Sequence, residues 1–80
     1  DVTDKRLLED IVDIFENFDE HDWLPASILT KELRGYGHTL TARQLHEILG
    51  NTGRESRVWE GSKYKVAGYF RKNIEKQLEQ

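Results

Sequence analysis

The sequence predicts one small domain of the α+β class, mostly helical with a single β-hairpin. Apolar residues recur every three or four positions in the first 50 residues and again at the C-terminal end, as on helices. Between these regions, over residues 54–70, the period shortens to two, as in strands. A chain of 80 residues has the size of one domain, so we take 1–80 as a unit, and because it contains no Met we expect it to be cut from a longer protein.

The first helix is expected over residues 4–17, with Thr3 as its N-cap. Its buried stripe consists of Leu7, Leu8, Ile11, Val12, Ile14, Phe15 and Phe18. After a polar break at 19–22, Pro25 suits the first turn of a second helix, which is expected over 25–34 and stops at Gly35. This second helix is expected to bury Ile28, Leu29 and Leu33.

The third helix, expected over 41–49, has the clearest boundaries. Thr41 and Gln44 have the spacing of a capping box, and Leu40 and Leu45 have that of a hydrophobic staple. Its buried stripe is Leu45, Ile48 and Leu49, and Gly50 ends it. Only 35–40 separate the second helix from the third, which predicts a helix-turn-helix connection.

A hairpin follows, with strands at 54–60 and 63–70 around the two-residue turn Gly61-Ser62. That turn would pair Trp59 with Tyr64, as a packing pair, and Arg57 with Val66. We expect 38–40 to supply a third strand and 71–80 to form a last helix that buries Ile74 and Leu78. The predicted order, α-α-(β)-α-β-β-α, is that of a winged helix-turn-helix.

Charge is divided unevenly along the chain. Residues 1–22 hold nine acids against two bases, a balance of −7, and residues 23–80 hold ten bases against six acids, a balance of +4. An acidic side turned away from DNA and a basic side turned toward it would explain this division. The alternative is a solvated acidic helix beside an ordinary mixed surface.

The third helix of such a fold enters the major groove with its N-terminal residues against the bases. Its exposed residues would be Ala42, Arg43, His46 and Glu47, with Asn51 just beyond its end, although Arg43 and Glu47 could equally form a surface ion pair. The candidate DNA-contacting residues are Lys31, Arg34, Thr41, Arg43, His46, Arg54, Arg57, Lys63 and Lys65. We expect phosphate contacts to outweigh base contacts and binding to be largely independent of sequence.

Other functions receive little support. The chain has no Cys, its three His lack metal-ligand spacing, and no phosphate-binding Gly-Lys-Ser/Thr loop is present. We therefore expect no catalytic residues, no metal and no cofactor. No apolar run approaches the ~20 residues of a membrane span and no signal peptide opens the chain, so we expect a cytoplasmic location without membrane contact.

The segments LTARQLHEIL and SRVWEGSKYKVAGYFRKNIEKQL resemble a domain family of unknown function in actinobacterial and phage proteins. In that family a similar pattern, LTAxxLAxLL followed by SR and GYxRxxFExxxxxY, lies at the C-terminal end of replicative helicase or primase-like ATPases. The resemblance covers residues 7–78; Gly68, Tyr69 and Arg71 match, whereas Ile74 replaces an aromatic residue. It implies a winged helix that helps a phage or plasmid replication machine engage DNA, or a partner such as the neighbouring ATPase or primase module.

The sequence is thus compatible with two functions. The first is DNA binding through the third helix and the hairpin of a replication or DNA-processing protein. The second is protein association through the acidic first helix or the hairpin, since one fold can serve both purposes.

Overall fold

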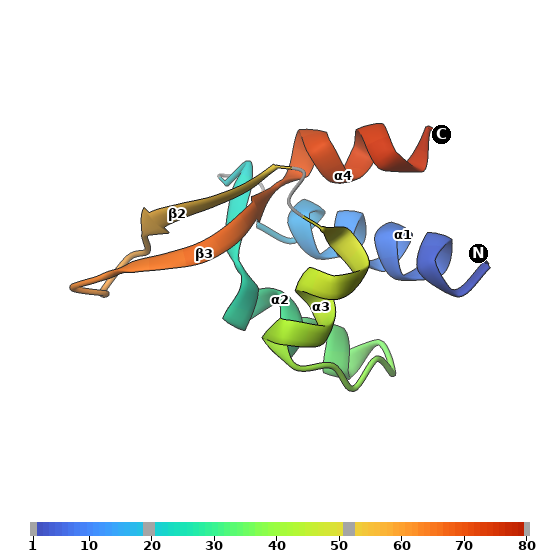
Figure 1. Ribbon diagram of the computed structural model, residues 1–80, viewed down its shortest axis with the longest axis horizontal. Coiled ribbons are helices and arrows are strands. Elements are labelled where there is room, and N and C mark those ends of the chain that lie inside the picture. The colour runs from blue at the N-terminus through green and yellow to red at the C-terminus, as the bar shows by residue number, and fades with distance from the viewer. Residues whose placement is uncertain (1, 19–20, 51–52, 80) are drawn as a thin grey trace.

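The computed structural model describes residues 2–18, 21–50 and 53–79, and within these ranges the chain forms four helices and one three-stranded sheet (Figure 1). The elements are α1 (Val2–Glu16), β1 (Trp23–Pro25), α2 (Ala26–Gly35), α3 (Ala42–Leu49), β2 (Arg54–Val58), β3 (Lys65–Phe70) and α4 (Arg71–Leu78). The sheet is antiparallel in the order β1-β3-β2. The α+β class predicted from the sequence is confirmed.

The helices follow the predicted apolar stripes with small shifts at their ends. α1 begins at Val2, so Thr3 lies within the helix and the prediction that it forms the N-cap is wrong. α2 begins directly after Pro25, whose backbone is extended (φ −66°, ψ 149°) and so sets the start of the helix. The last helix ends at Leu78, two residues before the predicted end at Gln80, which lies outside the described residues.

The third strand is Trp23–Pro25 and not 38–40, so the predicted element order is corrected to α-β-α-α-β-β-α. β1 pairs Trp23 with Phe70, Leu24 with Tyr69 and Pro25 with Gly68. All three of its residues are buried, so it shows no alternation of apolar and polar residues that a sequence pattern could reveal. The segment 38–40 instead packs beside α1, where His38 Nε2 lies 2.6 Å from Asp10 Oδ2.

The hairpin has the predicted register but a different turn. The ladder runs from Arg54 opposite Tyr69 to Val58 opposite Lys65 and includes the predicted pair of Arg57 and Val66. The strands then separate into a loop over 59–64, in which the Ser62 amide donates to the Trp59 carbonyl (2.9 Å). The two-residue turn and the pairing of Trp59 with Tyr64 are therefore wrong; Tyr64 is 77% exposed.

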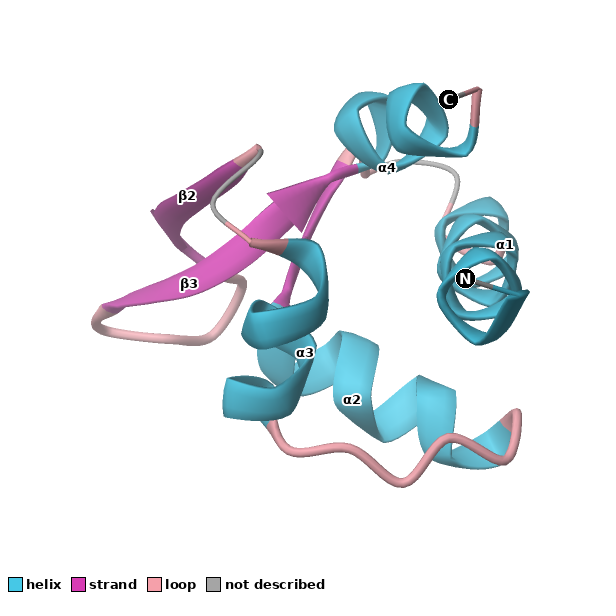
Figure 2. Ribbon diagram, turned by 45° about the vertical axis from the view of Figure 1, so that its right-hand side comes forward, coloured by secondary structure: helices cyan, strands magenta, loops and turns pink. Residues whose placement is uncertain are grey.

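The core lies between the helices and one face of the sheet, as the turned view shows (Figure 2). The four helices and the strand residues Leu24 and Tyr69 contribute buried side chains to it. In α3, Leu45 and Leu49 are buried as predicted, one helical turn apart. Ile48 lies beside this stripe and is 38% exposed, so its predicted burial is wrong.

Candidate nucleic-acid interface

The β2–β3 hairpin has two chemically different faces. Residues directly opposite each other in an antiparallel pair share a face, and successive residues alternate between faces. The inner face, on which Tyr69 joins the core, comprises Arg54, Ser56, Val58, Lys65, Ala67 and Tyr69. The outer face comprises Glu55, Arg57, Val66, Gly68 and Phe70, and Trp23 of β1 extends it.

α3 is fixed by its N-terminal cap and its two buried leucines. The Gln44 amide donates to Thr41 Oγ1 (3.1 Å) and the Thr41 amide donates to Gln44 Oε1 (2.9 Å), which confirms the predicted capping box. The Thr41 hydroxyl is thus occupied by the helix itself. With Leu45 and Leu49 turned inward, Ala42, Arg43 and Glu47 are exposed.

Arg43 is the most accessible cation of this helix. Its Nε lies 3.8 Å from Glu47 Oε1, and the two side chains are 90% and 66% exposed. Exposed pairs of this kind contribute only about 0–1 kcal/mol, so a phosphate or a base edge can compete with Glu47 for the guanidinium. The surface ion pair that the sequence left as an alternative is therefore formed, and it leaves Arg43 accessible.

His46 connects α3 to the hairpin. Its Nδ1 lies 3.3 Å from the Tyr69 hydroxyl and its Nε2 lies 3.4 Å from Arg54 Nη1. Because a guanidinium can only donate, Nε2 must accept from Arg54, and Nδ1 then carries the ring proton and donates to Tyr69. Both ring nitrogens therefore have partners within the protein, and Arg54 is held next to α3.

Tyr69 is the buried anchor of this contact. Its side chain is almost fully enclosed, and burial raises the pKa of its phenol, an effect that the positive charge of Arg54 partly offsets. Sequence reasoning assigned Tyr69 to the core alone and missed its hydroxyl. The only signal was its place in the matched Gly68-Tyr69-x-Arg71 pattern, which does not identify a bonding partner.

The remaining candidate residues divide between different surfaces. Lys65 is exposed on the inner face, and Lys63 is exposed in the loop at the protruding tip of the hairpin (Figure 1). Arg57 is on the outer face, where its Nε donates to Glu55 Oε2 (2.7 Å) and its guanidinium lies 4.7 Å from the centre of the Phe70 ring. Lys31 and Arg34 are exposed on α2, and Asn51 lies outside the described residues.

The structure thus brings His46 of α3 and Arg54 of β2 together, and Arg43 lies one turn before His46 on α3. Lys65 is on the same face as Arg54 at the other end of the ladder, and Lys63 follows in the loop at the tip. We refer to these five residues as the α3–hairpin surface. Lys31 and Arg34 lie on another helix, α2, and Arg57 is turned to the outer face. A cationic surface of this kind can hold phosphate groups through charge-assisted hydrogen bonds.

The described ranges contain no group of three or more His, Asp or Glu side chains that could hold a metal ion. Of the helices in this part of the chain, none is both long enough and apolar enough to cross a membrane. Comparisons with protein-family models, with curated proteins and with solved structures find no match to this chain.

Proposed function

We propose that the chain is a winged-helix DNA-binding domain of a replication or DNA-processing protein, binding duplex DNA largely through phosphate contacts. The corrected element order supports this proposal, because in it α2 and α3 would be the helix-turn-helix and β2 and β3 the wing. α3 would enter the major groove and the hairpin would follow the neighbouring phosphates.

The observation that carries the proposal is the link from α3 to the inner face through His46. It keeps Arg54 beside the helix that bears Arg43, so that cations from two elements are available to one segment of duplex. Lys65 and Lys63 extend the same surface along the hairpin. Because Arg54 is tied to a partly buried histidine, less side-chain freedom is lost when it meets a phosphate.

The expected contributions favour contacts that position the domain on the DNA backbone over contacts that recognise a base sequence. Four cations on phosphates would give a salt dependence of log K with a slope of about −3 to −4, since each contact contributes about −0.9. Arg43 alone could distinguish a correct base from a wrong one by about 1–3 kcal/mol. We therefore expect weak, salt-sensitive binding to many sequences.

One observation favours a second candidate, association with a protein. Loss of hydration, and then the negative charges of Asp13, Asp10 and Glu32, raise the pKa of Tyr36, which is exposed after the end of α2. The tyrosine and the carboxylates form an acidic corner between α1 and α2. Such a corner would suit a basic protein partner and would repel DNA.

The family resemblance implies the kind of protein to which this domain would belong. The domain would be appended to a helicase or primase-like ATPase of a phage or plasmid and would act in the cytoplasm. Its partners would be DNA and the neighbouring ATPase or primase module.

The test is a titration of labelled duplex DNA at several salt concentrations. Changing Arg43, Arg54, Lys63 and Lys65 together to Ala should weaken binding at least tenfold and flatten the salt slope by about 3 to 4. The matched control changes Lys5, Arg6, Lys72 and Lys76 to Ala, which removes the same charge from exposed positions of α1 and α4. Equal losses in both variants would refute the proposal, because net charge alone would then explain binding.

A further inference from the structure

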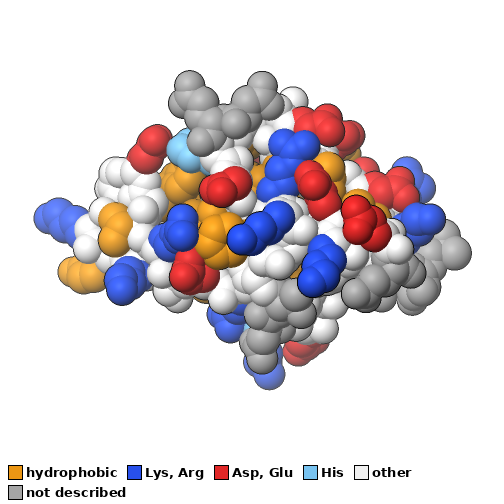
Figure 3. Space-filling view, turned by 90° about the horizontal axis from the view of Figure 1, so that it is seen from above, with side chains coloured by type: hydrophobic (Ala, Val, Ile, Leu, Met, Phe, Trp, Pro, Cys, Tyr) orange, Lys and Arg blue, Asp and Glu red, His pale blue; other side chains and the backbone are white. Residues whose placement is uncertain are grey.

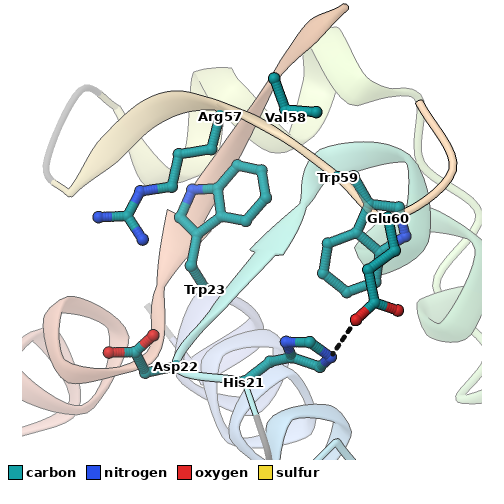
Figure 4. A pocket seen from close by; sticks show the side chains of 7 residues that line it. All are labelled: His21, Asp22, Trp23, Arg57, Val58, Trp59 and Glu60. Atoms are coloured by element: carbon teal, nitrogen blue, oxygen red, sulfur yellow. Dashed lines mark ion pairs between the residues drawn. The ribbon is translucent and has the colours of Figure 1, made fainter. Parts of the chain in front are cut away.

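The outer side of the sheet has a hollow of about 190 Å³. It is lined by His21, Asp22, Trp23, Arg57, Val58, Trp59 and Glu60 (Figure 4). The view from above, which looks onto the side opposite α2 and α3, shows acidic and basic side chains interspersed around exposed apolar surface (Figure 3). This hollow plays no part in the proposed contact with DNA.

Aromatic rings form the floor and one wall of the hollow. The Trp59 ring centre lies 4.8 Å from that of His21 and 6.2 Å from that of Trp23, and both pairs are tilted. Trp59 reaches this position because the strands separate after Val58, which lets its side chain fold back over the sheet. The hollow therefore depends on the loop that replaces the predicted two-residue turn.

Trp23 is held in place from below. Its Nε1 donates to the Glu55 carbonyl (3.2 Å), and its indole lies so close to Gly68 that a Cβ there would overlap both the ring and the Leu24 carbonyl oxygen. Glycine at this position thus lets the indole lie flat on β3. The ring that floors the hollow is rigid.

Two carboxylates lie at opposite ends of the hollow, Glu60 beside His21 and Trp59 and Asp22 beyond Trp23 (Figure 4). Asp22 is exposed, and the side chain of Glu60 is 80% exposed, with Oε1 3.9 Å from His21 Nε2 (Figure 4). The cation among the lining residues, Arg57, already donates to Glu55 (2.7 Å). The rim therefore disfavours an anion such as a DNA phosphate and favours a positive ligand.

Indole rings beside carboxylates are suited to a cation that can lie on a ring and donate hydrogen bonds to a carboxylate. The same side of the sheet already holds cations in this way, because Arg57 and Lys72 lie 4.7 and 5.6 Å from the centre of the Phe70 ring. Of the two protein cations, the planar guanidinium both stacks on rings and pairs bidentately with carboxylates.

We infer that this hollow binds an arginine side chain of a partner protein, with the guanidinium against Trp59 and paired with Glu60, while Asp22 adds negative charge at the far end of the hollow. The inference goes beyond the proposed DNA contact and does not depend on it. Because the α3–hairpin surface and the hollow are on opposite sides of the sheet, one domain could hold both ligands at once.

Intrinsic fluorescence tests this directly, since the two Trp of the chain are both in the hollow. The probe is a blocked tripeptide Gly-Arg-Gly, compared with Gly-Gln-Gly at constant ionic strength. We expect a saturable change in emission, in the millimolar range, with the arginine peptide alone. A response of the same size to the glutamine peptide, or a linear one, would overturn the inference.

Variants test the role of the carboxylates. Changing Asp22→Asn and Glu60→Gln together should weaken binding about three- to tenfold, as expected for the loss of an exposed ion pair and a second nearby charge. Glu9→Gln with Glu79→Gln, at exposed carboxylates outside the hollow, should leave binding unchanged. Equal weakening of peptide binding in the two double variants would contradict the inference. A saturable fluorescence change with a single-stranded oligonucleotide, which the arginine peptide does not displace, would also contradict it.

Discussion

The inner and outer faces of the β2–β3 hairpin are built from the same two strands, yet they present different chemistry. On the inner face, Arg54 is held by His46 of α3, and Lys65 is exposed beyond it. On the outer face, Arg57 is paired with Glu55 and lies over Phe70. Two arginines three positions apart in one strand therefore have different surroundings.

This difference shows why a count of basic residues is a poor guide to an interface. The alternation of a strand sends neighbouring side chains to opposite sides, so the register decides which cations act together. Arg54 and Lys65 add to the positive field of α3, whereas the acids Glu55 and Glu60 accompany Arg57. The comparison can be tested by altering each face separately.

The largest effect is expected from Gly68→Ala on the outer face. The new Cβ would overlap the Leu24 carbonyl oxygen and the Trp23 indole, so β1 must shift away from β3. Overpacking of this kind destabilises by about 1–3 kcal/mol. Urea unfolding followed by Trp fluorescence measures both the loss of stability and the displacement of the ring.

Gly35→Ala is the matched control for that variant. A Cβ at Gly35, at the end of α2, would meet no atom within 4 Å. Because alanine favours a helix over glycine by up to about 1 kcal/mol, the free energy of unfolding should stay the same or rise slightly. If Gly68→Ala were as harmless as Gly35→Ala, the close packing of Trp23 on β3 would be incorrect.

A smaller effect is expected from Thr41→Ala, which acts on the inner face through α3. This helix starts with a side-chain cap, whereas α2 and α4 start at Pro25 and Phe70 without one. Loss of the Thr41 hydroxyl should lower the free energy of unfolding by about 1 kcal/mol. The urea midpoint should fall with an unchanged m-value.

The control for the cap is Thr39→Ala, at an exposed threonine in the loop before α3. Such surface changes usually stay within about 0.5 kcal/mol. A loss at Thr39 equal to that at Thr41 would mean that the capping box contributes nothing to the stability of α3.

The capping box and the hairpin register were predictable because both follow from local spacing. Thr41 and Gln44 are three residues apart, and a period of two fixes which residues of 54–58 can face those of 65–70. The buried residues Leu29 and Leu33 of α2 were predictable for the same reason, since helical periodicity is itself a local property, whereas Ile28 of the predicted stripe is only half-buried.

Three features that the sequence did not reveal depend on contacts between residues of different segments. β1 is three residues long and pairs with a strand more than 40 positions later. In the loop at 59–64, Trp59 packs on Trp23 and His21, and the bonding of His46 depends on Tyr69 and Arg54. No single segment contains both partners of any of these contacts.

The smallest effect is expected from Tyr69→Phe, which removes the hydroxyl below His46. The lost hydrogen bond is long, at 3.3 Å, so stability at neutral pH should fall by no more than about 1 kcal/mol. Burial raises the pKa of Tyr69, so the folded protein holds the phenol proton more tightly than the unfolded chain does. The contribution of the Tyr69 phenol to stability is therefore complete below the pKa of about 10 that it has in the unfolded chain. This contribution is lost as the pH rises through the higher pKa of the folded protein.

The variant should therefore lose less stability than the parent protein as the pH rises above about 10. Urea unfolding at several pH values measures this, with Tyr64→Phe, at a ring that is 77% exposed, as the control. An alkaline decline that is identical in the parent protein and the Tyr69→Phe variant would show that the phenol is not buried as described.

The central claim is that the inner face of the hairpin, and not the outer face, meets DNA. The most direct test compares the salt dependence of duplex binding for Arg54→Ala and Arg57→Ala, which remove the same side chain from opposite faces of β2. Arg54→Ala should weaken binding severalfold and flatten the slope of log K against log salt by about 0.9, whereas Arg57→Ala should leave the slope unchanged. A flattened slope for Arg57→Ala with an unchanged slope for Arg54→Ala would contradict the account.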